Sequence, residues 1–109
     1  MFFDTDGTLV SINMRQVPSS TIHALTQAKA NGSCVYIATR RPPVIINNID
    51  SISHLTDGVI TTNGALCFVG DEPVCCNPIP KEDVMTCVND AKQKGYSIIV
   101  AGRKDVALP

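Results

Sequence analysis

The sequence predicts an α/β fold whose core is a parallel β-sheet with right-handed crossovers. Short apolar runs of strand length alternate with longer segments of helical periodicity, in the order strand, helix, strand, helix, strand, then hairpin, helix and strand. The expected helices carry start and stop signals, and the expected strands are apolar with β-branched residues. Such alternation is typical of a parallel sheet, because each crossover helix packs back onto the strands that it connects.

The first third of the chain is expected to contain two strands and the helix between them. Residues 2–4 form the end of a short buried strand. Pro18 and the two serines after it favour the start of a helix, and Asn31-Gly32 favours its end. Residues 34–38 are apolar throughout, which is the pattern of a strand buried on both faces.

The middle of the chain is expected to hold a helix, a strand and a hairpin. The two prolines after Arg41 break the preceding strand and open a second helix, which should extend to about Ile52. Residues 58–61 read as the third strand. Residues 66–69 and 73–76 are separated by a turn sequence and predict a β-hairpin.

The last part of the chain reads as a second unit. A change in composition divides residues 1–77, the N-terminal half of a core domain, from residues 78–109, the beginning of another domain. A helix starts at Pro80, carries acidic residues in its first turn and lysines in its last, and ends before Gly95. Residues 96–101 should form a further strand.

The composition narrows the class of protein. The chain has 109 residues, a net charge of −1, 44% hydrophobic and 17% charged residues, which is ordinary for one small globular domain or part of a larger one. We expect no nucleic-acid partner, because no basic surface is encoded, and no membrane partner, because no apolar run is long enough. The five cysteines contain no Cys-x-x-Cys pair and fit reduced thiols in a cytoplasmic protein.

The first segment with candidate functional residues is residues 2–10, Phe-Phe-Asp-Thr-Asp-Gly-Thr-Leu-Val. Asp4 and Asp6 are two residues apart, so in an extended segment their carboxylates project to the same side. Two such carboxylates repel each other unless a cation lies between them, and hard oxygen ligands favour Mg²⁺. Gly7 allows a sharp turn that brings backbone N–H groups to an anion, and Thr8 adds a hydroxyl. The segment is suited to holding a metal ion and a phosphate together.

Two other interpretations of this segment are an Asp-rich turn and part of a calcium loop. A calcium loop of the EF-hand type needs a closing Glu at its twelfth position, and the sequence after Gly7 lacks one. A simple turn does not require an apolar strand before it and Thr-Leu-Val after it. A site for a metal ion and phosphate is therefore the favoured interpretation.

Thr39 follows the second expected strand as Asp4 follows the first. Ligands of open α/β sheets bind outside the carboxyl ends of the strands, so Thr39 can donate to a phosphoryl oxygen beside Asp4. Arg40 and Arg41 could add positive charge there. The alternative for Thr39 is a purely structural helix cap.

Three segments of the chain resemble the haloacid dehalogenase superfamily of phosphohydrolases. Asp-Thr-Asp-Gly-Thr-Leu-Val at residues 4–10 is similar to its first signature motif. Ala-Thr-Arg-Arg-Pro at residues 38–42 resembles the second motif of its Cof-type branch, subclass IIB, and Thr-Thr-Asn-Gly-Ala at residues 61–65 resembles the segment after the third strand. The resemblance implies a Rossmann-like, three-layer parallel core, here incomplete, followed by the start of an α/β cap.

The resemblance also implies roles for individual residues. Asp4 would be the nucleophile, Asp6 the general acid and base, and both would ligate Mg²⁺, Asp6 through its backbone carbonyl. Thr39 would hold the transferring phosphoryl group, and Asn63 and Gly64 would lie near the substrate. Members of this branch most often hydrolyse sugar phosphates or other small phosphorylated metabolites.

The chain departs from the family pattern in two ways. Arg40 stands where the family usually has Gly, so either the backbone is strained there or the side chain swings outward. The later motifs, a Lys and an acidic pair, are absent, so we expect the 109-residue chain alone to be inactive and an active enzyme only at full length. The alternatives are a non-catalytic fragment that binds metal and phosphate, or a phosphomutase of the same branch. The oligomeric state is left open.

Overall fold

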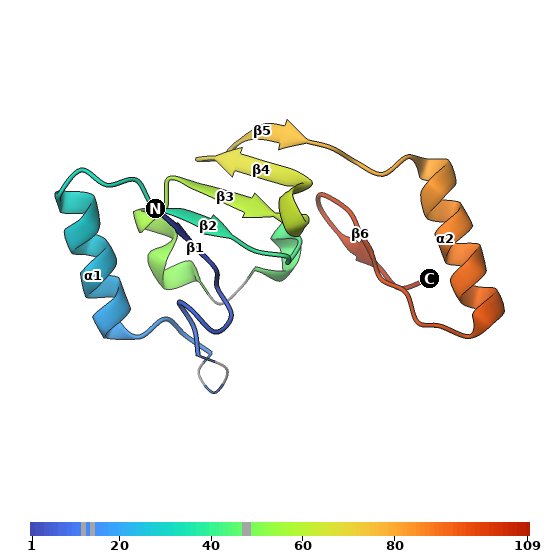
Figure 1. The fold of residues 1–109 in the computed structure, drawn as a ribbon, viewed down its shortest axis with the longest axis horizontal. Helices are drawn as coiled ribbons and strands as arrows, with labels where there is room; N and C mark the ends of the chain where they lie inside the picture. The colour runs from blue at the N-terminus through green and yellow to red at the C-terminus, as the bar shows by residue number, and fades with distance from the viewer. Residues whose placement is uncertain (12, 14, 47–48) are drawn as a thin grey trace.

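Five strands form one mixed β-sheet in the order β1-β2-β3-β4-β5 (Figure 1). The computed structural model describes residues 1–11, 13, 15–46 and 49–109. The strands are β1 (Phe2–Phe3), β2 (Tyr36–Ala38), β3 (Gly58–Thr61), β4 (Leu66–Val69) and β5 (Glu72–Cys76).

The sheet is parallel in its first part and antiparallel in its second. β1 pairs with β2 in parallel, with Phe3 opposite Ile37, and β2 pairs with β3 in parallel, with Ile37 opposite Val59. β4 and β5 are antiparallel and form the predicted hairpin. The α/β class and the hairpin predicted from the sequence are confirmed.

The helices differ in how well the sequence predicted them. α1 (Ser19–Ala30) is confirmed, with Pro18 as its N-cap and Asn31 as its C-cap. The second helix was predicted wrongly, because the chain forms two short 3₁₀ helices, η1 (Pro43–Ile45) and η2 (Asp50–Leu55). The β-branched residues in this stretch have weak α-helix propensity, and the residue after η1 is extended. Residues 47 and 48 of the expected helix lie outside the described part of the chain.

The core lies where α1 and η2 meet the parallel strands. Leu25 of α1 and Ile52 and Leu55 of η2 are buried together with Val35 and Ile37. Leu9, Val10, Val17 and Ile49 complete the cluster. The loop after β1 is thus part of the core on one side, and it presents its polar residues on the other.

The burial of the first two strands differs from the prediction. Phe2 was expected in a buried strand, but its side chain is 65% exposed because β1 is an edge of the sheet. In the run before Thr39, Val35 and Ile37 are fully buried, whereas Tyr36 is only partly buried and stacks on Phe2 with ring centroids 5.0 Å apart. The prediction that this run is buried on both faces is wrong, because in the described structure only one face of these strands is packed against helices.

After β5 the chain leaves the sheet and forms a separate group of elements. Figure 1 shows α2 (Lys81–Lys94) and β6 (Val100–Ala101) to one side, beyond an extended connection. α2 begins after Pro80 and ends at Gly95, as predicted. The strand expected over residues 96–101 is shorter than predicted, and β6 pairs with β7 (Val106–Ala107) in a second sheet. Among the described residues, neither helix has the length and apolarity needed to cross a membrane.

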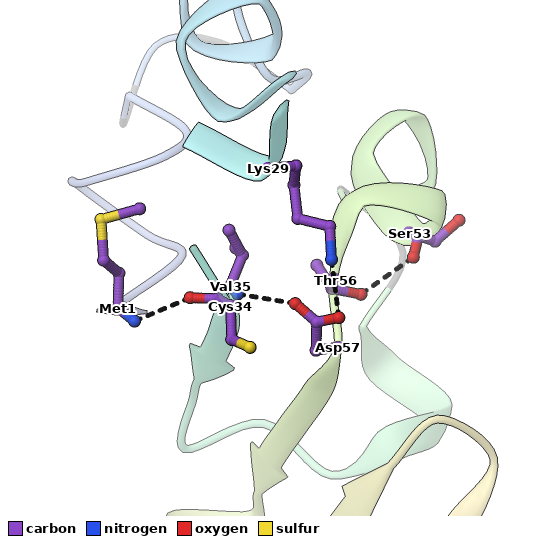
Figure 2. Close-up of polar contacts among 7 residues, drawn as sticks. All are labelled: Met1, Lys29, Cys34, Val35, Ser53, Thr56 and Asp57. Atoms are coloured by element: carbon purple, nitrogen blue, oxygen red, sulfur yellow. Dashed lines mark hydrogen bonds and ion pairs between the residues drawn. The ribbon is translucent and has the colours of Figure 1, made fainter. Parts of the chain in front are cut away.

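Asp57, the residue before β3, links several elements at the end of the parallel sheet that lies near the N-terminus (Figure 2). Its carboxylate accepts hydrogen bonds from Lys29 Nζ at 2.6 Å and from the Val35 backbone N–H at 2.7 Å. The Met1 nitrogen donates to the Cys34 carbonyl at 2.7 Å in the same region. One carboxylate therefore connects the end of α1, the start of β2 and the start of β3.

These contacts lower the pKa of the Asp57 carboxyl below its ordinary value, mainly through the hydrogen bond from Lys29 and next through that from Val35. A depressed folded-state pKa means that the stabilising contribution is complete above the unfolded pKa of about 4. The contribution is then lost as the pH falls through the lower folded-state value.

We predict that Asp57→Asn lowers the melting temperature at pH 7 by a few degrees at most, because the variant loses the carboxylate charge that accepts from Lys29 Nζ and the Val35 N–H, and partly exposed ion pairs contribute modestly. The difference between wild type and variant should shrink as the pH falls below about 4. Thermal unfolding followed by circular dichroism between pH 7 and pH 2 measures this. Asp71→Asn, in the exposed turn between β4 and β5, is the matched control. A difference that is constant over this pH range would contradict the assignment.

Candidate active site at the carboxyl ends of the parallel strands

The loop after β1 is a compact backbone turn centred on one carbonyl group. The Thr5 carbonyl accepts hydrogen bonds from the backbone N–H groups of Thr8, Leu9 and Val10, at 3.3, 3.1 and 2.9 Å. The Gly7 N–H donates to the Val10 carbonyl at 2.7 Å, and Gly7 has φ +82°. The turn needs a residue that tolerates positive φ, which explains the glycine.

This turn projects both aspartates to one side. Asp4 and Asp6 are exposed, whereas Thr5 between them is 1% exposed. Both carboxylates line one cavity of about 450 Å³, together with Thr39, Arg40 and Arg41. The Asp4 carboxylate is oriented by the Thr5 backbone N–H, which donates to Oδ1 at 2.9 Å. Gly7 and Thr8 are exposed in the same turn.

Thr39 lies directly after β2, beside Asp4. The register opposes Phe3 to Ile37, so Asp4 and Thr39 come at the same ends of two hydrogen-bonded strands. Thr39 is 7% exposed, and its Oγ1 accepts a hydrogen bond from the Arg41 backbone N–H at 3.1 Å. A hydroxyl that accepts one hydrogen bond still has a proton to donate, so Thr39 can bind a phosphoryl oxygen while it shapes the turn.

A third loop, after β3, closes the site. Its backbone is held to the Thr39 loop, because the Asn63 N–H donates to the Thr39 carbonyl at 3.3 Å and the Thr62 N–H to the Arg41 carbonyl at 3.0 Å. Thr62 and Asn63 both have positive φ, 50° and 54°. Asn63 and Gly64 line a second cavity of about 400 Å³, which also contains Asp4, Thr39 and Arg40. The structure therefore brings all three motif segments together.

The two arginines have different surroundings. Arg40 is exposed and lines both cavities. Thr62 and Asn63 are the only non-glycine positions with positive φ in the described chain, so the backbone at Arg40 is ordinary. Arg41 Nη2, in contrast, forms an ion pair with Asp6 Oδ1 at 3.0 Å. Both arginines were predicted from the sequence to bind phosphate, and the pairing of Arg41 with Asp6 was not predicted.

Two further threonines near this edge were not predicted from the sequence. Thr5 and Thr61 are each 1% exposed and, with Thr39 at 7%, are the buried polar side chains of the described residues. The Thr61 hydroxyl donates to the Leu66 carbonyl at 2.6 Å. A Thr occurs at or within two residues after the end of each of the three parallel strands, and this repetition in the sequence is the signal that could have found them.

The donor set at this edge suits a small, hard cation. Asp4 offers carboxylate oxygens in an open cavity, and Mg²⁺ commonly uses one or two carboxylates and keeps several waters. No three His, Cys, Asp or Glu side chains of the described residues are grouped so that they could share a metal ion. Asp4 and Asp6 therefore fit part of a Mg²⁺ shell rather than a complete one.

Comparison with known proteins identifies the family. The family model described as haloacid dehalogenase-like hydrolase matches residues 1–109. The chain belongs to the haloacid dehalogenase-like hydrolases. The resemblance stated from the three motif segments is thereby confirmed.

Solved structures agree with this assignment. The structure of the HAD subclass IIB sugar phosphatase BT4131 superposes with a TM-score of 0.91 at 44% identity and covers 98% of this chain. A structure from work on a trigonal-bipyramidal intermediate in a phosphoryl-transfer superfamily gives a TM-score of 0.91 at 43% identity, also over 98% of this chain. These neighbours confirm the Rossmann-like α/β fold.

A curated relative covers a similar stretch. The Bacillus subtilis (strain 168) protein "Putative phosphatase YkrA" is 24% identical over 100 residues, which is 91% of this chain and 38% of that protein. The chain also spans 42% of the length of the two solved structures. It therefore corresponds to less than half of the relatives that it matches.

We predict that Gly7→Ala lowers the free energy of unfolding by about 1–2 kcal/mol, the usual cost of a left-handed backbone for a residue with a side chain. No atom lies within 4 Å of a Cβ added there, so conformation rather than a clash causes the loss. Gly7→Asn should cost less than Gly7→Ala, because Asn tolerates this region better. Urea denaturation of the three proteins measures the order. Equal stability of the three proteins would contradict the assigned backbone strain.

Proposed function

We propose that this chain carries the nucleophile, the general acid and base, and part of the phosphate site of a Mg²⁺-dependent phosphatase for small phosphorylated metabolites. Sugar phosphates are the proposed substrate class, and a neighbour at 44% identity that is named a sugar phosphatase supports it. The observation that carries the proposal is the single cavity that Asp4, Asp6 and Thr39 line at the ends of two parallel strands.

The two aspartates divide the reaction. An oxygen of the Asp4 carboxylate attacks phosphorus, forming an aspartyl-phosphate while the bond from phosphorus to the ester oxygen breaks. Asp6 gives a proton to the departing oxygen. Asp6 then takes a proton from water, which attacks the aspartyl-phosphate and releases inorganic phosphate and free Asp4. Separate roles are reasonable because the Thr5 N–H orients Asp4 and the Arg41 guanidinium contacts Asp6.

The other residues of the site position the phosphoryl group. The Thr39 hydroxyl offers a hydrogen-bond donor to its oxygens, and the Thr8 hydroxyl in the exposed turn could add another. The sequence predicted that backbone N–H groups of this turn bind the anion, but the Gly7 and Thr8 N–H groups donate to the Val10 and Thr5 carbonyls within the turn.

Asn63 and Gly64 line the second cavity, which shares Asp4 and Thr39 with the first, and would contact the rest of the substrate. Arg40 lines both cavities and would add positive charge.

Mg²⁺ would be held by the Asp4 carboxylate and the Asp6 backbone carbonyl, and it would neutralise charge on the phosphoryl oxygens when bound. Water and residues outside this stretch would complete its shell, because the described residues offer only part of one. We therefore propose that the 109 residues by themselves bind metal and phosphate weakly without turnover, and that activity needs the protein at its natural full length.

Asp4→Asn in the protein at full length should abolish turnover of 4-nitrophenyl phosphate in the presence of Mg²⁺, because an amide oxygen is a poor nucleophile. Release of 4-nitrophenolate, followed by absorbance, measures the rate. Asp71→Asn is the matched control and should retain wild-type turnover. Retained activity of Asp4→Asn would reject Asp4 as the nucleophile.

Removal of divalent cations with EDTA should abolish activity, and Mg²⁺ should restore it, because the charge of the phosphoryl group then lacks its counter-ion. The products from a sugar phosphate distinguish the two reactions considered from the sequence. Inorganic phosphate indicates a phosphatase, whereas an isomeric sugar phosphate without phosphate release indicates a phosphomutase and contradicts this proposal.

A further inference from the structure

We propose that Arg41 is a positioning residue that orients the Asp6 carboxylate for proton transfer to the leaving group. This inference rests on the proposed function and assigns Arg41 a different task from Arg40, its neighbour in the same motif. Arg41 Nη2 lies 3.0 Å from Asp6 Oδ1, which is a charge-assisted hydrogen bond across 35 residues of sequence.

The backbone of Arg41 is held firmly from several sides. Its N–H donates to Thr39 Oγ1 at 3.1 Å, and its carbonyl accepts from the Thr62 N–H at 3.0 Å. Pro42 and Pro43 follow and restrict the chain further. The Arg41 backbone is therefore fixed within its own loop and to the loop after β3, which defines the point from which its side chain extends.

The guanidinium has an additional anchor. Nη1 donates to the Ile45 carbonyl in η1 at 3.5 Å, while Nη2 contacts Asp6. A planar guanidinium held at two points presents its donors in a fixed direction. The Asp6 carboxylate that it contacts is thereby fixed in direction as well.

The ion pair between Arg41 and Asp6 adds little to the stability of the fold. The side chains of Arg41 and Asp6 are 35% and 52% exposed, and ion pairs at such exposure contribute little to folding. Asp6 lies in a surface turn and is followed by Gly7, and its carboxylate is half exposed. The contact with Arg41 therefore limits the orientations of this carboxylate. General acid catalysis depends strongly on such direction, because the proton must be delivered along the breaking bond.

The same contact separates Arg41 from a simple phosphate ligand. A guanidinium that is hydrogen-bonded to a carboxylate has part of its charge neutralised and its donors directed at that carboxylate. Arg40 is exposed and lines both cavities, so it is the arginine suited to bind a phosphoryl oxygen directly. The two adjacent arginines should therefore give different kinetic signatures when they are replaced.

The test uses a leaving-group comparison in the full-length protein with Mg²⁺. 4-Nitrophenolate leaves readily without a proton, whereas a sugar alkoxide needs one. Arg41→Met should lower kcat/KM, which covers the steps up to departure of the leaving group, about 10- to 100-fold more for a sugar phosphate than for 4-nitrophenyl phosphate, a share of the roughly 10²–10⁴-fold that general acid–base catalysis contributes. Hydrolysis of the aspartyl-phosphate is common to both substrates and does not enter this comparison, and Arg41→Lys should restore part of the loss.

Asp6→Asn and Arg40→Met are the reference variants. Asp6→Asn should show the same selective loss on the sugar phosphate, and Arg40→Met should raise KM for both substrates alike. Equal losses of Arg41→Met on both substrates, or a rise in KM alone, would overturn the positioning role. An inactive wild type, or an Asp6→Asn variant without leaving-group selectivity, would instead overturn the proposed function on which the inference rests.

A second readout does not depend on turnover. In ¹⁵N-labelled protein, Arg41→Met should shift the amide resonances of Asp6 and Gly7, and Arg40→Met should leave them nearly unchanged. A melting temperature close to wild type establishes that each variant is folded. Unshifted Asp6 and Gly7 resonances in Arg41→Met would contradict the contact itself.

Discussion

Parallel hydrogen bonding among β1, β2 and β3 is the constraint on which the rest of the site depends. Parallel strands all end at the same edge of a sheet, so the residues that follow them meet there although they are distant in the sequence. The register that opposes Phe3, Ile37 and Val59 sets Asp4 beside the Thr39 loop. A shift of one residue in either pairing would turn these side chains to the opposite face.

The loops at this edge are shaped by their backbones more than by their side chains. The Thr5 carbonyl gathers three N–H groups, and the loop after β3 is joined to the Thr39 loop by two backbone hydrogen bonds. Positive φ values at Gly7, Thr62 and Asn63 make these turns possible. The carboxylates of Asp4 and Asp6 line the cavity, and each is oriented by one neighbour, Asp4 by the Thr5 N–H and Asp6 by the Arg41 guanidinium.

Charge is distributed unevenly over the two ends of the parallel sheet. At the end near the N-terminus, Asp57 is paired with Lys29 and a backbone N–H, and it joins three elements of the fold. At the other end, Asp4 is exposed in a cavity, and Asp6 meets Arg41. One aspartate thus serves the fold, and the two at the opposite end have the exposure that binding and proton transfer require.

The sequence by itself determined the strands of the parallel part, the hairpin, the helices α1 and α2 and the motif segments that line the cavities, because strand and helix periodicity and turn residues are local signals. It failed for the helix expected between Pro42 and Ile52, where β-branched residues favoured 3₁₀ turns, and for the burial of Phe2 and Tyr36, which depends on what covers a sheet face. Only the tertiary structure decided that Arg41 pairs with Asp6 while Arg40 lines both cavities. Neighbouring arginines look equivalent in a sequence. Their different roles depend on the direction of each side chain, and that direction depends on hydrogen bonds between loops that only the folded sheet brings together.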